Sequence, residues 1–177
     1  MEKIFYTDKS AYPSSQEAIE YLLKKIFGIV DARILKTDNG KPYLSNVHDV
    51  PLFFSVSHTK NLLFIAFSKE NIGIDAEYAT RRVHYAPIIK KLPQMEQNEI
   101  HSTADFLQHW LAKESAIKWL GGSIAKDLDN LAFYKNQVYY NNSHLPVHIT
   151  FQKFNDTILA ICSETAWEEA IIHSFPQ

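Results

Sequence analysis

The order of helical and extended segments limits the folds open to this chain more than any other feature of its sequence. Residues 14–27 place apolar side chains at helical spacing between a serine and Gly28, which predicts a capped amphipathic helix. Residues 105–120 predict a second helix, which Gly121 and Gly122 would end. Short β-rich runs follow each helix, and runs of this kind pair as antiparallel hairpins. The pattern therefore predicts an α+β fold in which a helix followed by hairpins occurs twice.

Turn residues divide the extended segments at close intervals. Asp38-Asn39-Gly40 predicts a hairpin within residues 31–44, and the next three runs predict an antiparallel meander. A chain of 177 residues can bury on the order of 70% of its unfolded surface. We therefore expect one compact domain over residues 1–177, with two halves of roughly 1–98 and 99–177. The expected strands are 53–57, 62–67 and 72–77 in the first half and 131–134, 137–140, 147–154 and 157–162 in the second.

Charge and composition exclude several classes of protein. Eighteen Lys plus Arg against twenty Asp plus Glu give a net charge of -2, which offers no general attraction to a nucleic acid backbone. The single cysteine, Cys162, permits no internal disulfide. The first residues lack the apolar stretch of a secretory signal, and the longest apolar run, 62–67, is too short to span a bilayer. We expect a soluble, cytoplasmic protein that binds neither nucleic acid nor membrane.

The run Ile72-Gly73-Ile74-Asp75-Ala76-Glu77 places two carboxylates on one face of a strand. Side chains alternate along a strand, so Asp75 and Glu77 point the same way, with Cα atoms roughly 7 Å apart. Both carboxylates could then reach a single metal ion. The alternative is an exposed polar strand face that binds nothing.

The second predicted helix carries a carboxylate inside its apolar stripe. Glu114 falls four residues after Trp110, and Lys118 follows four residues later on the same side. One interpretation is a surface Glu-to-Lys pair whose charged groups both reach water. The other is a third carboxylate that faces the strand pair and completes an oxygen-ligand site for Mg²⁺, with Lys118 placed to neutralise phosphate oxygens.

Three more candidates stand at turns. His58 ends a predicted strand directly after Ser57, and Lys41 lies between Gly40 and Pro42 in a constrained turn. Each is also compatible with an ordinary polar residue at a strand end or in a solvated turn. A basic stretch follows the acidic strand and is either a solvated face or a docking surface for an acidic partner; it contains Arg81, Arg82, Lys90 and Lys91.

Four sequence blocks combine these candidates in a fixed order. They are Gly40-Lys41-Pro42, Phe54-Ser55-Val56-Ser57-His58-Thr59, Ile72-Gly73-Ile74-Asp75-Ala76-Glu77 and Trp110-Leu111-Ala112-Lys113-Glu114-Ser115-Ala116-Ile117-Lys118. Together they resemble the signature of the 4′-phosphopantetheinyl transferases of the Sfp-like, surfactin-synthetase-activating type. The resemblance extends from about residue 15 to about residue 165, and the last two blocks are its most specific parts.

The resemblance implies a fold, a reaction and partners. The fold would be a pseudo-dimer in which two similar halves, each a helix packed on an antiparallel sheet, meet at a cleft. Such enzymes transfer the phosphopantetheine arm of coenzyme A to a serine of an apo acyl or peptidyl carrier protein and release adenosine 3′,5′-bisphosphate. Because helix plus hairpins occurs twice in one chain, we expect a monomer.

The resemblance also implies roles for single residues. Asp75, Glu77 and Glu114 would bind Mg²⁺, and Glu114, directly or through a metal-bound water, would take the proton of the carrier serine. Lys118 and His58 would hold the coenzyme A phosphates and act with Glu114 in catalysis. The remaining coenzyme contacts would come from Ser57, from Lys41 and Pro42 in the nucleotide pocket, and from Lys24 and Lys25 at the 3′-phosphate.

This sequence departs from the family pattern at some positions, and other functions compete with transfer. Ser55 stands where an asparagine is usual, and Ala76 is small for its place; we expect both to affect packing only. A Mg²⁺-dependent phosphohydrolase or nuclease could use the same carboxylates, although a second ligand cluster and a basic net charge are missing. A non-catalytic module that binds coenzyme A or a carrier protein is the second alternative, which the intact carboxylate trio disfavours.

Overall fold

A computed structural model describes residues 2–45, 51–82, 84–168 and 170–175 of the chain. Both predicted helices are confirmed. Helix α1 (Ser15–Phe27) begins after Ser14, whose hydroxyl accepts the backbone N–H of Glu17 at 3.2 Å, and ends at Gly28 with a φ of 69°. Helix α4 (Thr103–Leu120) has the same design, with Ser102 as its N-cap and Gly121 at a φ of 70°. Local capping signals therefore fixed the ends of both helices.

Two sheets form the centre of the molecule. The first contains β1 (Lys3–Asp8), β4 (Phe53–His58), β5 (Leu62–Ser68) and β12 (Ile172–Ser174), in the order β12-β1-β5-β4. The second contains β6 (Ile72–Tyr78), β10 (His148–Phe154) and β11 (Thr157–Ser163), in the order β10-β11-β6. All pairings within them are antiparallel except the parallel pair of β1 and β12. The mixed α+β class predicted from the sequence is confirmed.

Smaller elements surround this centre. The predicted hairpin at residues 31–44 is present as β2 (Ile34–Lys36) and β3 (Pro42–Leu44). After α4, the chain forms a small sheet of β7 (Leu131–Tyr134), β8 (Gln137–Tyr140) and β9 (Ser143–His144). The short helices are α2 (Ala86–Ile89), α3 (Gln94–Gln97), α5 (Ile124–Asp127) and the 3₁₀ turns η1 (Lys9–Ala11) and η2 (Leu128–Asn130). None of the helices in the described ranges is long and apolar enough to cross a membrane.

The predicted meander of three consecutive strands is wrong in its pairing. β4 and β5 do pair, but the other neighbour of β5 is β1, a strand that the sequence reasoning did not identify. β6 instead pairs along its length with β11, nearly ninety positions away in the chain. Since β1 and β4 already occupy both edges of β5, β6 cannot pair with β5, and its backbone partner is β11 of the second sheet.

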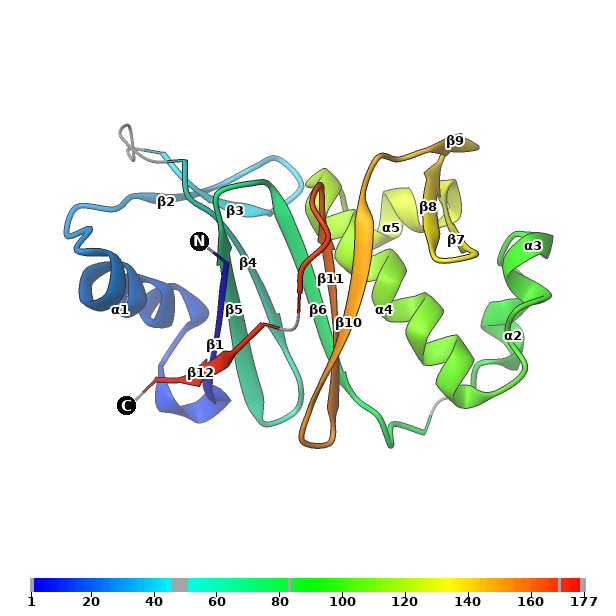
Figure 1. The fold of residues 1–177 in the computed structure, drawn as a ribbon, viewed down its shortest axis with the longest axis horizontal. Coiled ribbons are helices and arrows are strands. Elements are labelled where there is room, and N and C mark those ends of the chain that lie inside the picture. Colours follow the sequence, from blue (N-terminus) through cyan, green and yellow to red (C-terminus); the bar gives the residue numbers. More distant parts are fainter. Residues whose placement is uncertain (1, 46–50, 83, 169, 176–177) are drawn as a thin grey trace.

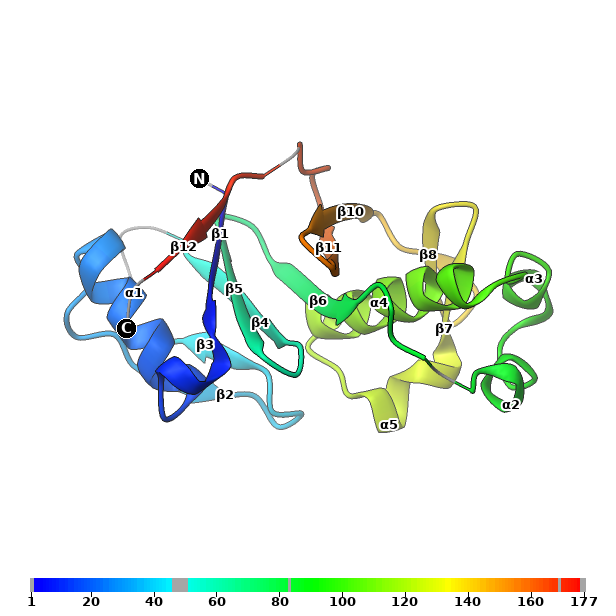
Figure 2. The same cartoon turned by 90° about the horizontal axis from the view of Figure 1, so that it is seen from below.

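The elements stack in layers from α1 to α4. In Figure 1 and Figure 2, α1 covers the outer side of the first sheet and α4 covers the second sheet at the opposite end. One apolar cluster lies between α1 and the first sheet, a second lies between the two sheets, and a third lies between α4, the second sheet and β7–β8. Each half thus has a helix packed on an antiparallel sheet, while the equivalence of the halves and their boundary near residue 98 remain predictions.

Gly73 sets how closely α4 approaches β6. A Cβ atom built on Gly73 would lie 2.0 Å from the backbone oxygen of Ser115 and 2.5 Å from the backbone nitrogen of Trp119. Only a residue without a side chain leaves room for the helix backbone there. Ile72, Ile74 and Ala76 pack on the opposite side, between the sheets. As a result, the alternate residues of β6, including Asp75, face α4.

Candidate active site between β6 and α4

Asp75 is the centre of the candidate site. Its Oδ1 atom accepts hydrogen bonds from the Nζ atom of Lys118 and from the hydroxyl of Ser57, both at 2.8 Å. Lys118 also donates to the backbone oxygen of Ile74 at 2.8 Å. The three side chains come from β6, α4 and β4, so the site forms where all three elements meet. The predicted proximity of Asp75 and Lys118 is confirmed by this geometry.

Two buried serines hold β4 beside β6 without a backbone ladder. The Oγ atoms of Ser55 and Ser57 accept the backbone N–H groups of Ile74 and Ala76, each at 3.0 Å. These N–H groups lie on the free edge of β6 and would otherwise be buried without a partner. The sequence suggested that Ser55 affects packing only. In the structure its hydroxyl also accepts a backbone hydrogen bond from β6, which holds this strand next to Ser57 and His58.

Glu114 lies within reach of Asp75, as predicted for the helix carboxylate. Its side chain forms hydrogen bonds with the side chains of Asp75 and Trp110. Burial, followed by the negative charge of Asp75, raises the pKa of Glu114 to about 7, although Lys118 acts in the opposite direction. Phe106, Trp110, Glu114 and Lys118 follow at intervals of four residues, so a single row of α4 carries all of them. A carboxylate with this pKa can exchange a proton near neutral pH.

Glu77 is engaged in contacts of its own. Its carboxylate forms an ion pair with Arg81 and accepts the backbone N–H of Tyr78 at 2.9 Å. Within the described residues, no three His, Cys, Asp or Glu side chains are gathered closely enough to hold a metal ion. The structure therefore brings Asp75 and Glu114 together, while Glu77 is paired with Arg81. The predicted three-carboxylate Mg²⁺ site remains a prediction.

Two cavities are lined by neighbours of Asp75: the first by its ion-pair partner Lys118, and the second by Glu77, two residues away on β6. The first, of about 250 Å³, lies between the β2–β3 turn, β4 and α4, and its lining includes Lys41, Pro42, Phe54, Glu114, Lys118 and Ser123. The second, of about 480 Å³ and wide open to solvent, is lined mainly by polar side chains: Lys9, His58, Thr59, Lys60, Glu77, Tyr78, Thr80 and Arg81. An elongated ligand with several charged groups could extend along both cavities and past Lys118.

The comparisons with known proteins agree with this site. No family model matches the chain. Three curated proteins do: 4′-phosphopantetheinyl transferase gsp of Aneurinibacillus migulanus at 27% identity, the putative 4′-phosphopantetheinyl transferase slr0495 of Synechocystis at 27%, and 4′-phosphopantetheinyl transferase Sfp of Bacillus subtilis at 26%. The alignments cover 80%, 75% and 75% of this chain. The chain is a relative of the Sfp-like 4′-phosphopantetheinyl transferases.

This relationship has a limit of length. The alignments span only 63%, 58% and 63% of the three transferases, less than two thirds of each. The predicted family resemblance is confirmed, and it supports an enzyme of this kind.

Some of the residues predicted to contact the coenzyme lie at the candidate site, and others lie away from it. Lys41 and Pro42 line the first cavity, and His58 lines the second. Lys24 and Lys25 line neither cavity, because they are exposed in the last turn of α1 on the outer side of the first sheet. Basic residues in that turn complement the negative end of the helix dipole, which accounts for their position.

Two basic residues of the second cavity were missed by the sequence reasoning. Lys9 follows β1, which was not predicted, and Lys60 lies in the turn directly after His58. Burial lowers the pKa of His58, and the charges of Lys9 and Lys118 lower it further. Lys9 and Lys118 therefore stand close to one imidazole. Lys60 could have been predicted from the sequence, because it lies two residues after His58. Lys9 could not, because its position depends on the pairing of β1 with β5.

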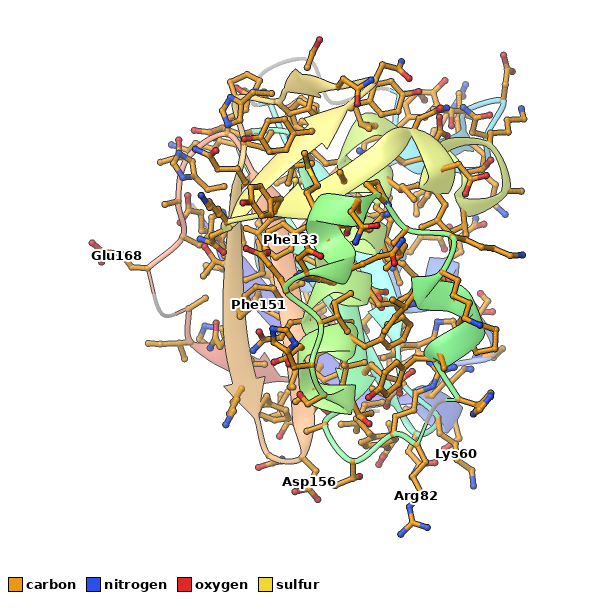
Figure 3. All side chains as sticks on the ribbon, turned by 90° about the vertical axis from the view of Figure 1, so that its right-hand side faces the viewer. Lys60, Arg82, Phe133, Phe151, Asp156 and Glu168 are labelled. Atoms are coloured by element: carbon orange, nitrogen blue, oxygen red, sulfur yellow. The ribbon has the colours of Figure 1, made fainter. Side chains whose placement is uncertain are left out.

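The basic stretch after β6 is divided between two positions. Arg81 lines the second cavity and pairs with Glu77, whereas Arg82, Lys90 and Lys91 are exposed. Figure 3 shows Lys60 and Arg82 pointing outward at the same end of the molecule. Positive charge thus surrounds the opening of the second cavity, as the docking interpretation of this stretch requires.

Proposed function

We propose that this protein transfers the 4′-phosphopantetheine arm of coenzyme A to a serine hydroxyl of an apo acyl or peptidyl carrier protein and releases adenosine 3′,5′-bisphosphate. One observation carries the proposal most directly. Two carboxylates, Asp75 and Glu114, lie together beside the Lys118 ammonium; Glu114 and Lys118 line a cavity with Lys41, and a second cavity next to Glu77 is lined by further cations. A phosphoryl-type transfer needs this combination, because it depends on charge neutralisation and positioning more than on covalent catalysis.

The cations of the two cavities suit the phosphates of coenzyme A. Lys118 would bind diphosphate oxygens at the first cavity, since its side chain lines that cavity. Lys9, His58 and Lys60 would bind phosphate groups from the second cavity. We therefore assign the phosphate contacts that the sequence reasoning gave to Lys24 and Lys25 to Lys9 and Lys60. Ser57 would act indirectly, by holding Asp75 through its hydroxyl.

The donor set suits Mg²⁺. Two carboxylates that share a buried site repel each other when both are ionised, and this repulsion is part of what raises the pKa of Glu114 to about 7. Mg²⁺ commonly binds through one or two carboxylates together with substrate phosphates, so Asp75 and Glu114 would hold it and Glu77 could join on release from Arg81. When bound, the ion would neutralise charge on the diphosphate oxygens.

Glu114 would act as the general base. The carrier serine oxygen attacks the phosphorus that bears the pantetheine arm, and its proton passes to the Glu114 carboxylate. The bond from that phosphorus to the bridging oxygen of the diphosphate breaks, and the electron pair leaves on adenosine 3′,5′-bisphosphate. Lys118 and His58 would stabilise the charge that develops on this leaving group. Trp110 orients the base through its hydrogen bond to Glu114.

The partner and the assembly follow from the same geometry. Asp75 and Glu114 come from one chain and meet inside it, so a monomer would contain a complete site. The exposed Arg82, together with Lys60 beside the second cavity, would attract an acidic carrier protein. Such surface charge acts mainly on the rate and orientation of encounter, and salt screens it over roughly 8 Å at physiological strength.

Incubation of the protein with coenzyme A, Mg²⁺ and an apo carrier protein, followed by mass spectrometry of the carrier, tests the proposal. Transfer adds the mass of one phosphopantetheine arm. Consumption of coenzyme A without a modified carrier would indicate a phosphohydrolase instead, and neither change would indicate a binding module. Glu114→Gln should abolish the added mass, while Lys24→Ala, which alters an exposed lysine away from both cavities, serves as the matched control.

A further inference from the structure

Lys41 is a half-buried cation without an anionic partner. Its Nζ atom donates to Oδ1 of Asn71 at 2.7 Å and to the backbone oxygen of Trp119 at 3.2 Å. Both acceptors are neutral, and none of the ion pairs formed among the described residues includes Lys41. Lys41 is one of the residues that line the first cavity. An anion that entered this cavity would meet a charge that the protein itself has not neutralised.

The environment of Lys41 opposes its charge. Burial lowers the pKa of Lys41 to about 8, because the ammonium loses water without gaining a counter-ion. The titratable group that acts on it is Cys162, whose own pKa is raised by burial to about 12, so that the thiol is uncharged at neutral pH. The protein keeps a destabilised positive charge at this position, and a ligand with negative charge would relieve it.

Two lysines of α4 each have a carboxylate as ion-pair partner, as buried or partly buried lysines usually do. Lys118 is paired with Asp75 at 2.8 Å, and Lys113 is paired with Glu96 at 3.0 Å. Lys41 approaches the same helix, at its C-terminal end, but has an asparagine in the position where the other two have a carboxylate. The first cavity therefore contains one lysine that already has a counter-ion and one that does not.

Asn71, in the turn between β5 and β6, is held so that its oxygen faces Lys41. Its Nδ2 atom donates to the backbone oxygen of Trp119 at 2.7 Å, while Oδ1 accepts from Lys41. With the amide reversed, an N–H group would point at the ammonium and an oxygen at a carbonyl, so the two contacts settle the orientation. The side chain thus fixes the ammonium in place and leaves its charge uncompensated.

We propose that Asn71 is a positioning residue that holds the Lys41 ammonium as a free positive charge for a phosphate group of the coenzyme in the first cavity. This inference rests on the proposed function for the identity of the ligand. Asparagine is suited to the task because it supplies the hydrogen bond of a carboxylate without its charge. An aspartate would offer Lys41 the same acceptor oxygen and cancel the charge that the ligand needs, while losing the Nδ2 hydrogen bond to Trp119.

Binding of coenzyme A, measured by calorimetry in the absence of a carrier, tests the inference. Asn71→Asp should weaken binding about tenfold, which is the effect of roughly one lost charge interaction. Its kcat at saturating coenzyme should stay within about twofold of the parent, since the reacting groups around Asp75 are untouched. Asn98→Asp makes the same charge change on the exposed cap of α3 and should leave binding unchanged. Parent-like affinity in Asn71→Asp would overturn the inference.

A double-mutant cycle separates positioning from simple repulsion. Lys41→Met should weaken coenzyme binding by itself, and adding Asn71→Asp to that variant should cause little further loss, because Asn71 acts through Lys41. An equal loss from Asn71→Asp in both backgrounds would show that the new carboxylate acts on the ligand directly and would contradict the inference. Labelling of Lys41 by an amine reagent should also shift to higher pH in Asn71→Asp, which is independent of any ligand.

These outcomes also separate the inference from the proposed function. A parent protein that binds coenzyme A, responds to Asn71→Asp as expected and fails to modify any carrier would refute transfer and support the anion site. A parent protein that does not bind coenzyme A would refute both.

Discussion

Two lysines of α4, five residues apart, form ion pairs of nearly equal length in opposite surroundings. Lys113 and Glu96 are 3.0 Å apart, with 2% and 0% of their side-chain surfaces exposed. Lys118 and Asp75 are 2.8 Å apart, with 31% and 11% exposed. The first pair is sealed between α3, α4 and the protein interior, whereas Lys118 of the second pair lines the first cavity. The two lysine–carboxylate pairs therefore differ in their access to solvent, and we expect them to have different roles.

The sealed pair ties the segment between β6 and α4 to the helix. Glu96 lies on α3, and burial raises its pKa while Lys113 lowers it. Tyr85 of the same segment stacks on Phe106 of α4 at 5.2 Å. A buried pair gains little net energy over apolar residues but strongly penalises the loss of one partner, so it favours a single arrangement. The open pair can instead exchange partners with a ligand.

The largest effect is expected at the open pair. Lys118→Met should lower transfer to the carrier by about 10² to 10⁴, since an interaction with the developing phosphate charge is lost. Thermal stability should change little, because Lys118 is partly exposed and Asp75 keeps its bond to Ser57. Steady-state rates at saturating coenzyme and carrier measure this, with Lys24→Met as the control. Transfer at the rate of the parent would mean that the open pair is structural as well.

The sealed pair should respond in stability. Lys113→Met leaves the Glu96 carboxylate buried without its partner and should cost about 3 to 5 kcal/mol of unfolding free energy. The double variant Lys113→Met/Glu96→Met replaces both charges by apolar groups and should recover most of that loss. Urea titrations of the three proteins provide the comparison. Single and double variants of equal stability would show that the pair is not coupled.

The two pairs also differ in how well they could be predicted from the sequence. Spacing along α4 and alternation along β6 led to the prediction that Asp75, Glu77 and Glu114 share one site with Lys118 nearby, and the structure brings Asp75, Glu114 and Lys118 together but pairs Glu77 with Arg81. Neither pattern identified Glu96 as the partner of Lys113, since the fold of α3 decides that contact. The same limit applies to β6, which was predicted as a strand but given the wrong neighbours.

Residues contributed by distant segments were the hardest to foresee. Lys9 reaches the second cavity only because β1 pairs with β5. The role of Asn71 can be inferred only once Lys41 is seen to lie against the end of α4. Ser55 was expected to affect packing, yet it accepts a backbone hydrogen bond from the neighbouring strand. Each of these contacts joins positions whose pairing depends on the sheet order, which local propensity does not encode.

A smaller effect is expected where α4 meets β6. Gly73→Ala would place a methyl group 2.0 Å from the backbone oxygen of Ser115, and separating the two backbones should cost about 1 to 3 kcal/mol. The shift should also move Lys118 from Asp75 and lower transfer, whereas the Lys113–Glu96 pair should persist. Denaturant melts and rates measure the two consequences. Because the clash is with main chain, adding Ser115→Gly should not restore either value; a rescue would contradict the assignment.

The smallest effect concerns His109, next to the sealed pair. Its ring is buried, lies edge-on to Phe133 at 5.3 Å, and has a pKa that burial, and further the charge of Lys113, lower from the ordinary 6.5. Below that value the unfolded chain takes up the proton more readily than the folded one, so His109 should reduce stability as the pH falls below 6.5. His109→Gln should flatten the fall in urea midpoint between about pH 7.5 and 5.5.

His58 provides the matching control at the open pair. Its pKa is also lowered, so His58→Gln should flatten the same pH dependence, to a smaller degree because the side chain is more exposed. An unchanged pH dependence in His109→Gln would remove this histidine from the acid response of the sealed region.

The pairing of β6 with β11 makes the two halves interdependent for reassembly. β6 belongs to the first half by sequence, yet its backbone register runs from Ile72 opposite Ser163 to Tyr78 opposite Thr157 in the second. Fragments divided near residue 98 would each lose a strand partner, and the second would expose the edge of β11. We expect such fragments to be poorly soluble alone and to complement each other when co-expressed, so that recovered activity would report when two proteins fused to them come together.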